Sequence, residues 1–295
     1  MWPSPYFLLG LTILFWAGNF VVGRGLHDNI TPVALTFWRW FTAWVLILPF
    51  VWKPLREQFQ LILRFWKLIA LFGTLGVAGF NSLVYIGLAT TTATNGVLLN
   101  TTSPVWIVLL SRLIFKQPLS WRQGFGIAVA FLGVATIVTK GHLAALWGFQ
   151  FHSGDLFVLA GVLCWAVYTV LLPLRPPALL PSAFLGAVVT VGTIIIVPFF
   201  LLEKGHDVLP AFTPSVMAGI FYLALFPSVL AYIFWNHAVL KVGARRAGYF
   251  IYLMPVFGAL LSFTFLNESF LPYHGVGIIL ILLGVYLAMS TAGPR

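Results

Sequence analysis

The chain has 295 residues, of which 61% are hydrophobic and only 7% are charged, and its mean hydropathy is +1.01. Soluble globular domains carry about 25% charged residues, so this composition excludes that class and indicates a membrane protein with several spans. A formal net charge of +10 would suit nucleic acid, but the basic residues lie beside apolar segments, where they meet anionic lipid headgroups. We therefore expect a lipid bilayer and no nucleic acid among the partners.

Ten segments are long enough, at roughly 20 residues each, to cross the hydrocarbon core of a bilayer. In chain order they centre near Leu14, Val45, Ala78, Val105, Ala130, Cys164, Val191, Leu230, Leu260 and Leu283. These runs lack the alternation of barrel strands, so the predicted fold class is an all-α polytopic membrane protein with ten transmembrane helices. The first segment lacks the basic start and cleavage site of a signal peptide, so we expect it to be retained.

Basic residues predict how the chain is threaded. One set of loops and span ends holds Lys53, Arg56, Arg64, Lys67, Arg112, Lys116, Arg122, Arg175, Lys241, Arg245, Arg246 and Arg295. The opposite set holds only Arg24, Lys140 and Lys204. By the positive-inside rule, both termini are predicted to be cytoplasmic.

The two halves of the chain match each other. At an offset of 151 residues, Pro104, Ser111, Gln117, Gly124, Gly126 and Gly133 align with Pro255, Ser262, Glu268, Gly275, Gly277 and Gly284. At an offset of 149, Trp16, Pro32 and Pro49 align with Trp165, Pro181 and Pro198. The pattern predicts two five-helix repeats, 1–147 and 148–295, in one integral membrane unit. Because five is odd, the second repeat enters from the opposite side, which makes the repeat inverted.

Inverted repeats provide a route to alternating access around a midplane site, which favours a carrier over a channel or an enzyme. Pro104 and Pro255 occupy matched positions, and each removes a backbone donor, which predicts a helix bend. Pro104 closes the polar run 100–104, which we expect to form part of a cavity wall. The alternative is that Thr101 and Thr102 only bond back to their own helix.

Polar and aromatic side chains inside the spans suggest where a substrate cavity lies. Asn81 and Tyr85 share one helix face, and Tyr232 and Asn236 repeat the pair in swapped order at the offset of 151. The predicted cavity residues are Trp16, Asn19, Asn81, Tyr85, Thr101, Trp165, Tyr168, Tyr232, Asn236 and Tyr252. Such a pocket suits a flat, apolar or aromatic solute. The alternative for these side chains is hydrogen bonding or packing between helices.

Arg39 is the ionisable residue placed most clearly inside a span, and an intramembrane charge is expected to be functional. It could bind a substrate carboxylate, or it could pair structurally with Glu268 or Asp28. His237, beside Asn236, could carry a proton, although a simple hydrogen bond is the favoured interpretation.

Five-span halves with a helical proline, a Gln or Glu at the end of that helix and then a glycine-spaced helix resemble the drug/metabolite transporter superfamily, in its EamA-type ten-helix branch. The stretch LNESFLPYHGVGIILILLGVYL, residues 266–287, is the most specific part. The resemblance implies a secondary transporter in a bacterial inner membrane that exports small neutral or zwitterionic metabolites, amino acids including aromatic ones. Gln117 stands where the family often has Glu.

The sequence lacks the residues that several other classes of function would require. There is no phosphate-binding loop for an ATPase motor, and the acids lie in loops or at span ends, so facilitated diffusion or exchange is favoured over proton coupling. A nucleotide-sugar carrier would need several cavity cations, and an intramembrane enzyme would need converging acids, or a nucleophile with its base. These two, other drug or metabolite exporters and a lipid scramblase stay as alternatives. We expect no metal, no cofactor and a monomer.

Overall fold

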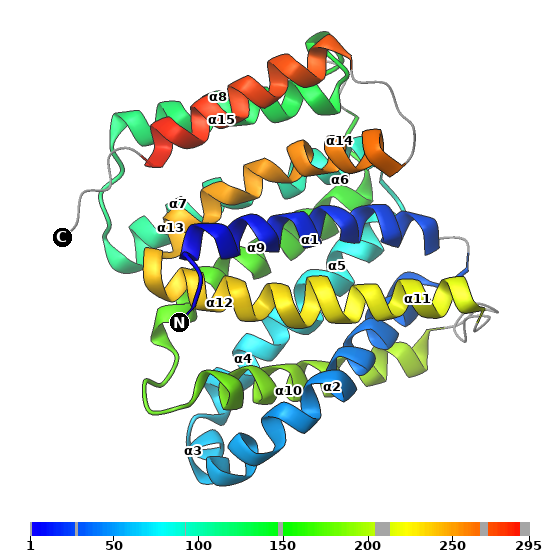
Figure 1. The fold of residues 1–295 in the computed structure, drawn as a ribbon, viewed down its shortest axis with the longest axis vertical. Helices are drawn as coiled ribbons and strands as arrows, with labels where there is room; N and C mark the ends of the chain where they lie inside the picture. The colour runs from blue at the N-terminus through cyan, green and yellow to red at the C-terminus, as the bar shows by residue number, and fades with distance from the viewer. Residues whose placement is uncertain are drawn as a thin grey trace.

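The computed structural model describes residues 2–26, 29–91, 93–146, 150–203, 213–265 and 271–289, and these residues contain helices and turns but no strand. Nine of the described helical segments are long and apolar enough to cross a membrane. The helices run side by side across Figure 1, and the start of α1 lies at the same end of the bundle as the end of α15. The chain is therefore a polytopic, all-helical bundle.

The helices up to residue 146 are α1 (Pro5–Leu26), α2 (Pro32–Glu57), α3 (Phe59–Arg64), α4 (Trp66–Phe72), the π-helix η1 (Gly73–Gly79), α5 (Phe80–Leu88), α6 (Ala93–Asn100), α7 (Ser103–Phe115), α8 (Trp121–Val138) and the 3-10 turn η2 (Leu143–Leu146). From residue 150 onward they are α9 (Ser153–Leu171), the 3-10 turn η3 (Leu172–Leu174), α10 (Pro181–Leu202), α11 (Pro214–Leu223), the π-helix η4 (Ala224–Leu230), α12 (Ala231–Val242), α13 (Ala244–Tyr249), the 3-10 turn η5 (Phe250–Leu253), α14 (Met254–Phe265) and α15 (Pro272–Met289).

The predicted span near Leu260 corresponds to three consecutive pieces, α13, η5 and α14, rather than to one regular helix. It is not among the nine spans found by length and hydropathy in the described part of the chain. Pro255 sits in the first turn of α14, where a proline needs no backbone donor, and the 3-10 turn precedes it.

Element boundaries recur at the offset found in the sequence. The π-helices η1 and η4 start 151 residues apart, at Gly73 and Ala224, and α8 and α15 start at Trp121 and Pro272. The other matched starts at this offset are those of α6 with α13 and of α7 with α14. Helix α2 starts at Pro32 and α10 at Pro181, which is the offset of 149. The matched prolines Pro32 and Pro181, like Pro104 and Pro255, thus stand in the first turn of a helix, where a missing N–H costs nothing. The third matched pair, Pro49 and Pro198, lies inside α2 and α10.

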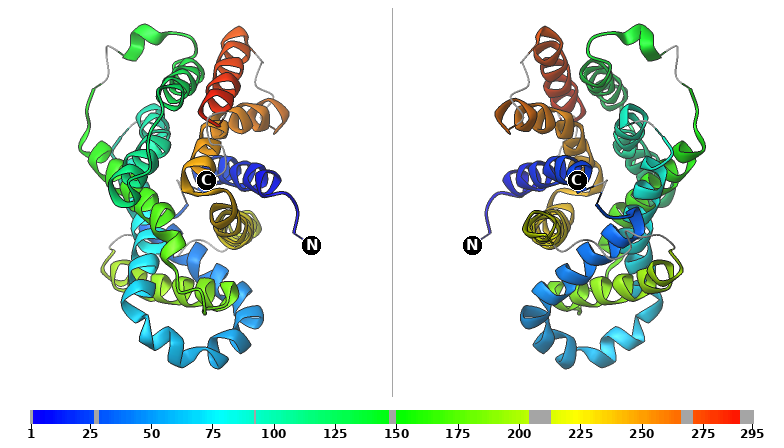
Figure 2. Two further views of the ribbon diagram at one scale, coloured as in Figure 1. Left: turned by 90° about the vertical axis from the view of Figure 1, so that its left-hand side faces the viewer. Right: turned by 90° about the vertical axis from the view of Figure 1, so that its right-hand side faces the viewer.

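Glycines explain the closest helix pair. Helices α8 and α15 form one edge of the bundle, opposite α2, α3 and α10 (Figure 2). A Cβ on Gly126 would lie 2.6 Å from the carbonyl oxygen of Gly284, and a Cβ on Gly133 would lie 2.7 Å from that of Gly277. Small residues allow backbones to approach in a membrane, where packing replaces the hydrophobic effect. The repeated glycine spacing is therefore a packing device.

A polar contact joins α2 to the end of α10. Glu203 accepts hydrogen bonds from the backbone N–H groups of Val33 and Ala34 and from the Thr31 hydroxyl, at 3.3, 2.9 and 2.6 Å. The first N–H groups of a helix have no partner within the helix, and a carboxylate is also favoured by the helix dipole there. Glu203 thus caps a helix that lies far from it in the sequence.

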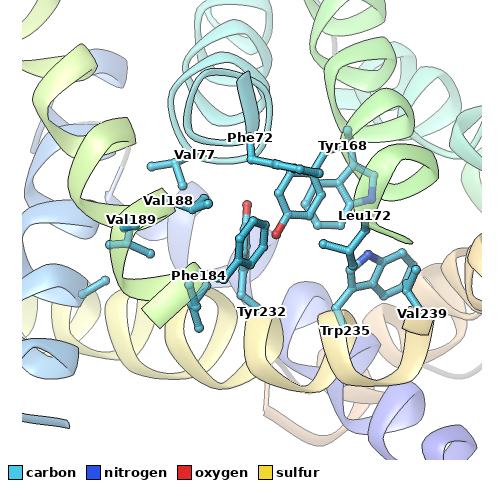
Figure 3. Close-up of a cluster of buried hydrophobic side chains, with 14 of the residues drawn as sticks. Phe72, Val77, Tyr168, Leu172, Phe184, Val188, Val189, Tyr232, Trp235 and Val239 are labelled. Atoms are coloured by element: carbon cyan, nitrogen blue, oxygen red, sulfur yellow. The ribbon is translucent and has the colours of Figure 1, made fainter. Parts of the chain in front are cut away.

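The main core lies between α2, α4, η1, α9, α10 and α12. Phe72 meets Tyr168 and Phe184 edge to face, and Tyr168 meets Tyr232 at a tilt. Trp235 belongs to the same buried cluster (Figure 3). The ring centroids of Tyr168 and Tyr232 are 6.0 Å apart. Aromatic rings at this spacing contribute packing energy beyond their buried area. This core holds the walls of the site described next.

Candidate functional site

A cavity opens beside this core, where α1, α2, α5, the end of α6, α7, α9, α12, η5 and the start of α14 converge. The empty space in it is about 580 Å³, a figure that includes the open space at its mouth. The lining residues are Trp16, Asn19, Arg39, Phe80, Asn81, Val84, Tyr85, Asn100, Ser103, Trp165, Tyr232, Ile251 and Met254. The wall is thus apolar and aromatic, with amides, hydroxyls and one guanidinium.

Arg39 organises the polar side of this cavity. Its side chain is 3% exposed, and its Nη1 donates to Asn19 Oδ1, Asn81 Oδ1 and Tyr85 OH at 3.0, 3.0 and 3.1 Å. Its Nε donates to Ser228 Oγ at 2.6 Å. All of these acceptors are neutral, so the hydrogen bonds disperse the positive charge without cancelling it.

No carboxylate pairs with Arg39 in the described part of the chain. Glu57 forms an exposed pair with Lys53 at 3.8 Å, and Glu203 caps α2. Asp155 accepts hydrogen bonds from Thr91 and Asn95 at the start of α9. The partners suggested by the sequence, Glu268 and Asp28, lie outside the described residues.

The two π-helices present carbonyl oxygens to the site. Gly76 O in η1 accepts hydrogen bonds from the Tyr232 hydroxyl and from Asn81 Nδ2, the latter at 3.3 Å. Pro227 in η4 is the counterpart of Gly76 at the offset of 151. Its carbonyl oxygen accepts hydrogen bonds from Trp16 Nε1 at 3.1 Å and from Arg39 Nη2 at 3.4 Å. A π-helical turn shifts the i to i−4 ladder and leaves such carbonyls available to other helices, and it often occurs at functional sites.

Those contacts also fix the amide of Asn81. Its Nδ2 donates to Gly76 O and to Val77 O, the latter at 3.1 Å. The amide oxygen is therefore the atom that must face Arg39, because the nitrogen is already committed as a donor. The orientation follows from the hydrogen-bond network.

Aromatic rings form the other wall. Trp16 and Trp165 meet edge to face with centroids 5.0 Å apart, and Phe80 lies 5.3 Å from Trp165. Tyr232 also contacts Trp165, at 5.6 Å. Because the Trp16 indole is held by Pro227 O, its ring has a fixed orientation, which favours a flat apolar group in the space beside it.

The polar run 100–104 divides between cavity and helix. Asn100 and Ser103 line the cavity, whereas the Thr101 and Thr102 hydroxyls bond back to Leu98 O and Leu99 O at 2.7 and 2.6 Å. Pro104 leaves Asn100 O without a backbone donor, and the Ser103 hydroxyl supplies one at 2.6 Å. The carbonyl that the sequence predicts to be free is therefore satisfied, and the helix is interrupted between α6 and α7.

The structure brings together six of the ten predicted cavity residues around Arg39: Trp16, Asn19, Asn81, Tyr85, Trp165 and Tyr232. It places the other four away from the lining. Tyr168 donates to Asn236 Oδ1 at 2.9 Å, Thr101 is buried, and the buried Tyr252 hydroxyl has no hydrogen-bond partner in the described structure. His237 stacks on Trp2 with ring centroids 4.7 Å apart and does not line the cavity.

The sequence reasoning missed several contributors. Phe80 and Val84 lie one residue before Asn81 and Tyr85, on the adjacent strip of α5, so the same helical spacing could have indicated them. Ser228 holds Arg39 Nε, yet its match at the offset of 151 is Val77, and the repeat pattern therefore could not reveal it. Among the described residues, no three His, Cys, Asp or Glu side chains gather as a metal site would require.

Comparisons with known proteins identify the family. The model of the EamA-like transporter family matches residues 3–139 and again 152–290. Two uncharacterized transporters are similar over most of their lengths: one from Archaeoglobus fulgidus, 32% identical over 97% of this chain and 98% of the relative, and YyaM from Bacillus subtilis, 28% identical over 95% and 92%. A probable terminal-alkyne amino-acid exporter from Streptantibioticus cattleyicolor is 28% identical over 97% and 94%.

The fold has a solved counterpart as well. One crystal structure superimposes with a TM-score of 0.78 at 19% identity, covering 98% of this chain and 97% of the other, which is a likeness of fold alone. The family match covers most of the chain, and the apolar helices are those of an integral membrane protein. This chain belongs to the EamA-like transporter family within the drug/metabolite transporter superfamily.

Proposed function

We propose that this protein is a secondary transporter that exports small metabolites, amino acids including aromatic ones among them, by alternating access around the cavity at Arg39. The observation that carries the proposal is the composition of that cavity. One wall holds a guanidinium with amides and hydroxyls, the other wall holds Trp16 and Trp165, and both halves of the chain contribute. Such a pocket orients a polar end and encloses an apolar one.

The proposed architecture is ten spans in two inverted repeats, 1–147 and 148–295, with α13, η5 and α14 as the ninth span. Three observations support it. The helix boundaries recur in the two halves, and the family model matches each half once. Several helices also contact, in the opposite half, the counterparts of the helices that their own counterparts contact. Helix α1 packs on α12 and α14 as α9 packs on α5 and α7, while α2 meets η4 as α10 meets η1. Exchange of this kind is expected about a pseudo-twofold axis.

The substrate class draws support from a relative. The Streptantibioticus relative is named as a probable terminal-alkyne amino-acid exporter. An amino acid with an apolar side chain fits the cavity chemically, because its carboxylate can meet Arg39 and its side chain can lie against the two tryptophans. We further propose a monomer without cofactor in the bacterial inner membrane, with both termini cytoplasmic, as the basic residues predict.

The test is flux of labelled L-tryptophan and L-phenylalanine into proteoliposomes, with unlabelled competitors. We expect saturable, competable flux. Tyr85→Phe removes one hydrogen bond to Arg39 and should weaken the apparent affinity about three- to tenfold, or roughly 0.6 to 1.5 kcal/mol. Tyr286→Phe is the matched control, because Tyr286 is 68% exposed on α15. Equal kinetics for the two variants would refute the cavity assignment, and flux no greater than in empty vesicles would refute amino-acid transport.

A further inference from the structure

Within the described part of the chain, the positive charge of the cavity has no counter-charge. Arg39 is the one charged side chain among the described lining residues, and the other twelve are neutral. The described carboxylates, Glu57, Asp155 and Glu203, are engaged elsewhere, as shown above. The Arg39 guanidinium also lies 5.4 Å from the centroid of the Trp40 ring. A buried charge held only by dipoles and an aromatic face is costly compared with one that faces a counter-ion. The site is therefore poised to gain from an anion.

The hydrogen-bond inventory shows where that anion would bind. A guanidinium has five N–H donors. The Nε donor is used by Ser228 and the two Nη1 donors are shared by three acceptors, but Nη2 has only Pro227 O, at 3.4 Å. That contact is long for an N–H···O bond. Nη2 is thus the least satisfied nitrogen, and a carboxylate is the acceptor that best suits it.

An ammonium group would have no anionic partner among the described lining residues. The described lining residues offer neutral oxygens on Asn19, Asn100 and Ser103 and the faces of two indoles, but no carboxylate. An ammonium brought in beside a carboxylate bound to Arg39 would also feel the guanidinium at close range, in a medium of low dielectric constant. Each of these effects disfavours a zwitterion relative to an anion of the same shape.

We propose that Arg39 binds the carboxylate of the transported solute, and that the cavity prefers an apolar or aromatic monocarboxylate without an ammonium group to a zwitterionic amino acid. The inference rests on the proposed transport function and narrows its substrate class. It also identifies a driving force. Export of a monoanion moves negative charge out of a cell that is negative inside, and 100 mV favours this about fiftyfold in the concentration ratio. No proton-carrying carboxylate is then required.

The first test uses three solutes that share a phenyl ring and a short chain but differ in charge: 3-phenylpropanoate, L-phenylalanine and phenethylamine. Each competes with the flux of labelled 3-phenylpropanoate in proteoliposomes, with empty vesicles subtracted. We expect 3-phenylpropanoate to inhibit at a concentration at least tenfold lower than L-phenylalanine, and phenethylamine to inhibit least. This comparison uses the unaltered protein, so it does not depend on any variant folding.

The second test uses vesicles loaded with 3-phenylpropanoate and a potassium gradient with valinomycin. An inside-negative potential should accelerate efflux, and the reversed potential should slow it. Arg39→Gln should lower 3-phenylpropanoate flux at least tenfold while retaining flux of the neutral 3-phenylpropanamide, because only the anion needs the charge. Lys53→Gln, at an exposed cation outside the cavity, should leave both fluxes unchanged.

The outcomes separate the two proposals. Saturable flux in which L-phenylalanine equals or exceeds 3-phenylpropanoate, or efflux that ignores the potential, overturns the monocarboxylate inference and leaves amino-acid export standing. A folded Arg39→Gln variant that transports 3-phenylpropanoate as the unaltered protein does would also overturn it. Absence of saturable flux for all of these solutes and for L-tryptophan overturns both proposals.

Discussion

Replacing one glycine between α8 and α15 should destabilise the protein measurably. A Cβ on Gly126 would lie 2.5 Å from the backbone nitrogen of Ala288 and 2.6 Å from Gly284 O. Ordinary contact begins at 3.4 Å, so the two backbones must separate locally by about 0.9 Å, since neither obstacle is a movable side chain. Overpacking of this kind costs about 1 to 3 kcal/mol.

Gly124→Ala provides the matched control for Gly126→Ala. Gly124 lies on the same helix, but an added Cβ there meets nothing within 4 Å. Both substitutions gain the same helix propensity, up to about 1 kcal/mol. The difference between the two variants therefore isolates the clash with α15.

The assay heats the detergent-solubilised protein and measures the fraction that stays monodisperse. Gly126→Ala should lose half of that fraction at a temperature roughly 2 to 12 °C below that of Gly124→Ala, given 2 to 4 °C per kcal/mol for a large domain. If the two variants lost half at the same temperature, α8 and α15 would not be packed backbone to backbone, and the packing explanation of the repeated glycines would fail.

Three further outcomes are expected. Tyr252→Phe should leave transport unchanged and stability unchanged or higher, because it removes a buried hydroxyl without a partner in the described structure; a change in solute affinity, measured by flux, would instead place Tyr252 in the cavity. Asp155→Asn should lower the unfolding free energy by about 1 to 3 kcal/mol, measured by thermal unfolding, because the carboxylate accepts from Thr91 and the backbone N–H of His152; unchanged stability would refute its capping role. In a Cys164→Ala background, Arg122→Cys should react with a membrane-impermeant maleimide only after cells are opened, and labelling of intact cells would reverse the threading.

Much of the architecture follows from the sequence by itself. Bilayer thickness sets span length, so apolar runs of about 20 residues predict helices whatever their neighbours are. The offset of 151 that aligns Pro104 with Pro255 also relates the starts of η1 and η4. Helical geometry places Asn81 and Tyr85 on one face, and both reach Arg39.

Which polar faces meet depends on how the helices pack in three dimensions. Tyr168 and Asn236 look equivalent to Asn19 and Tyr85 along their helices, yet they bond to each other away from the cavity, while Ser228, without a polar match in the repeat, holds Arg39. The physical reason is that spacing along one helix determines which side chains share a face, whereas the rotation of that face is set by packing against other helices. Close approach at glycines and the π-helical turns at Gly76 and Pro227 set those rotations, and these depend on contacts between residues far apart in the sequence.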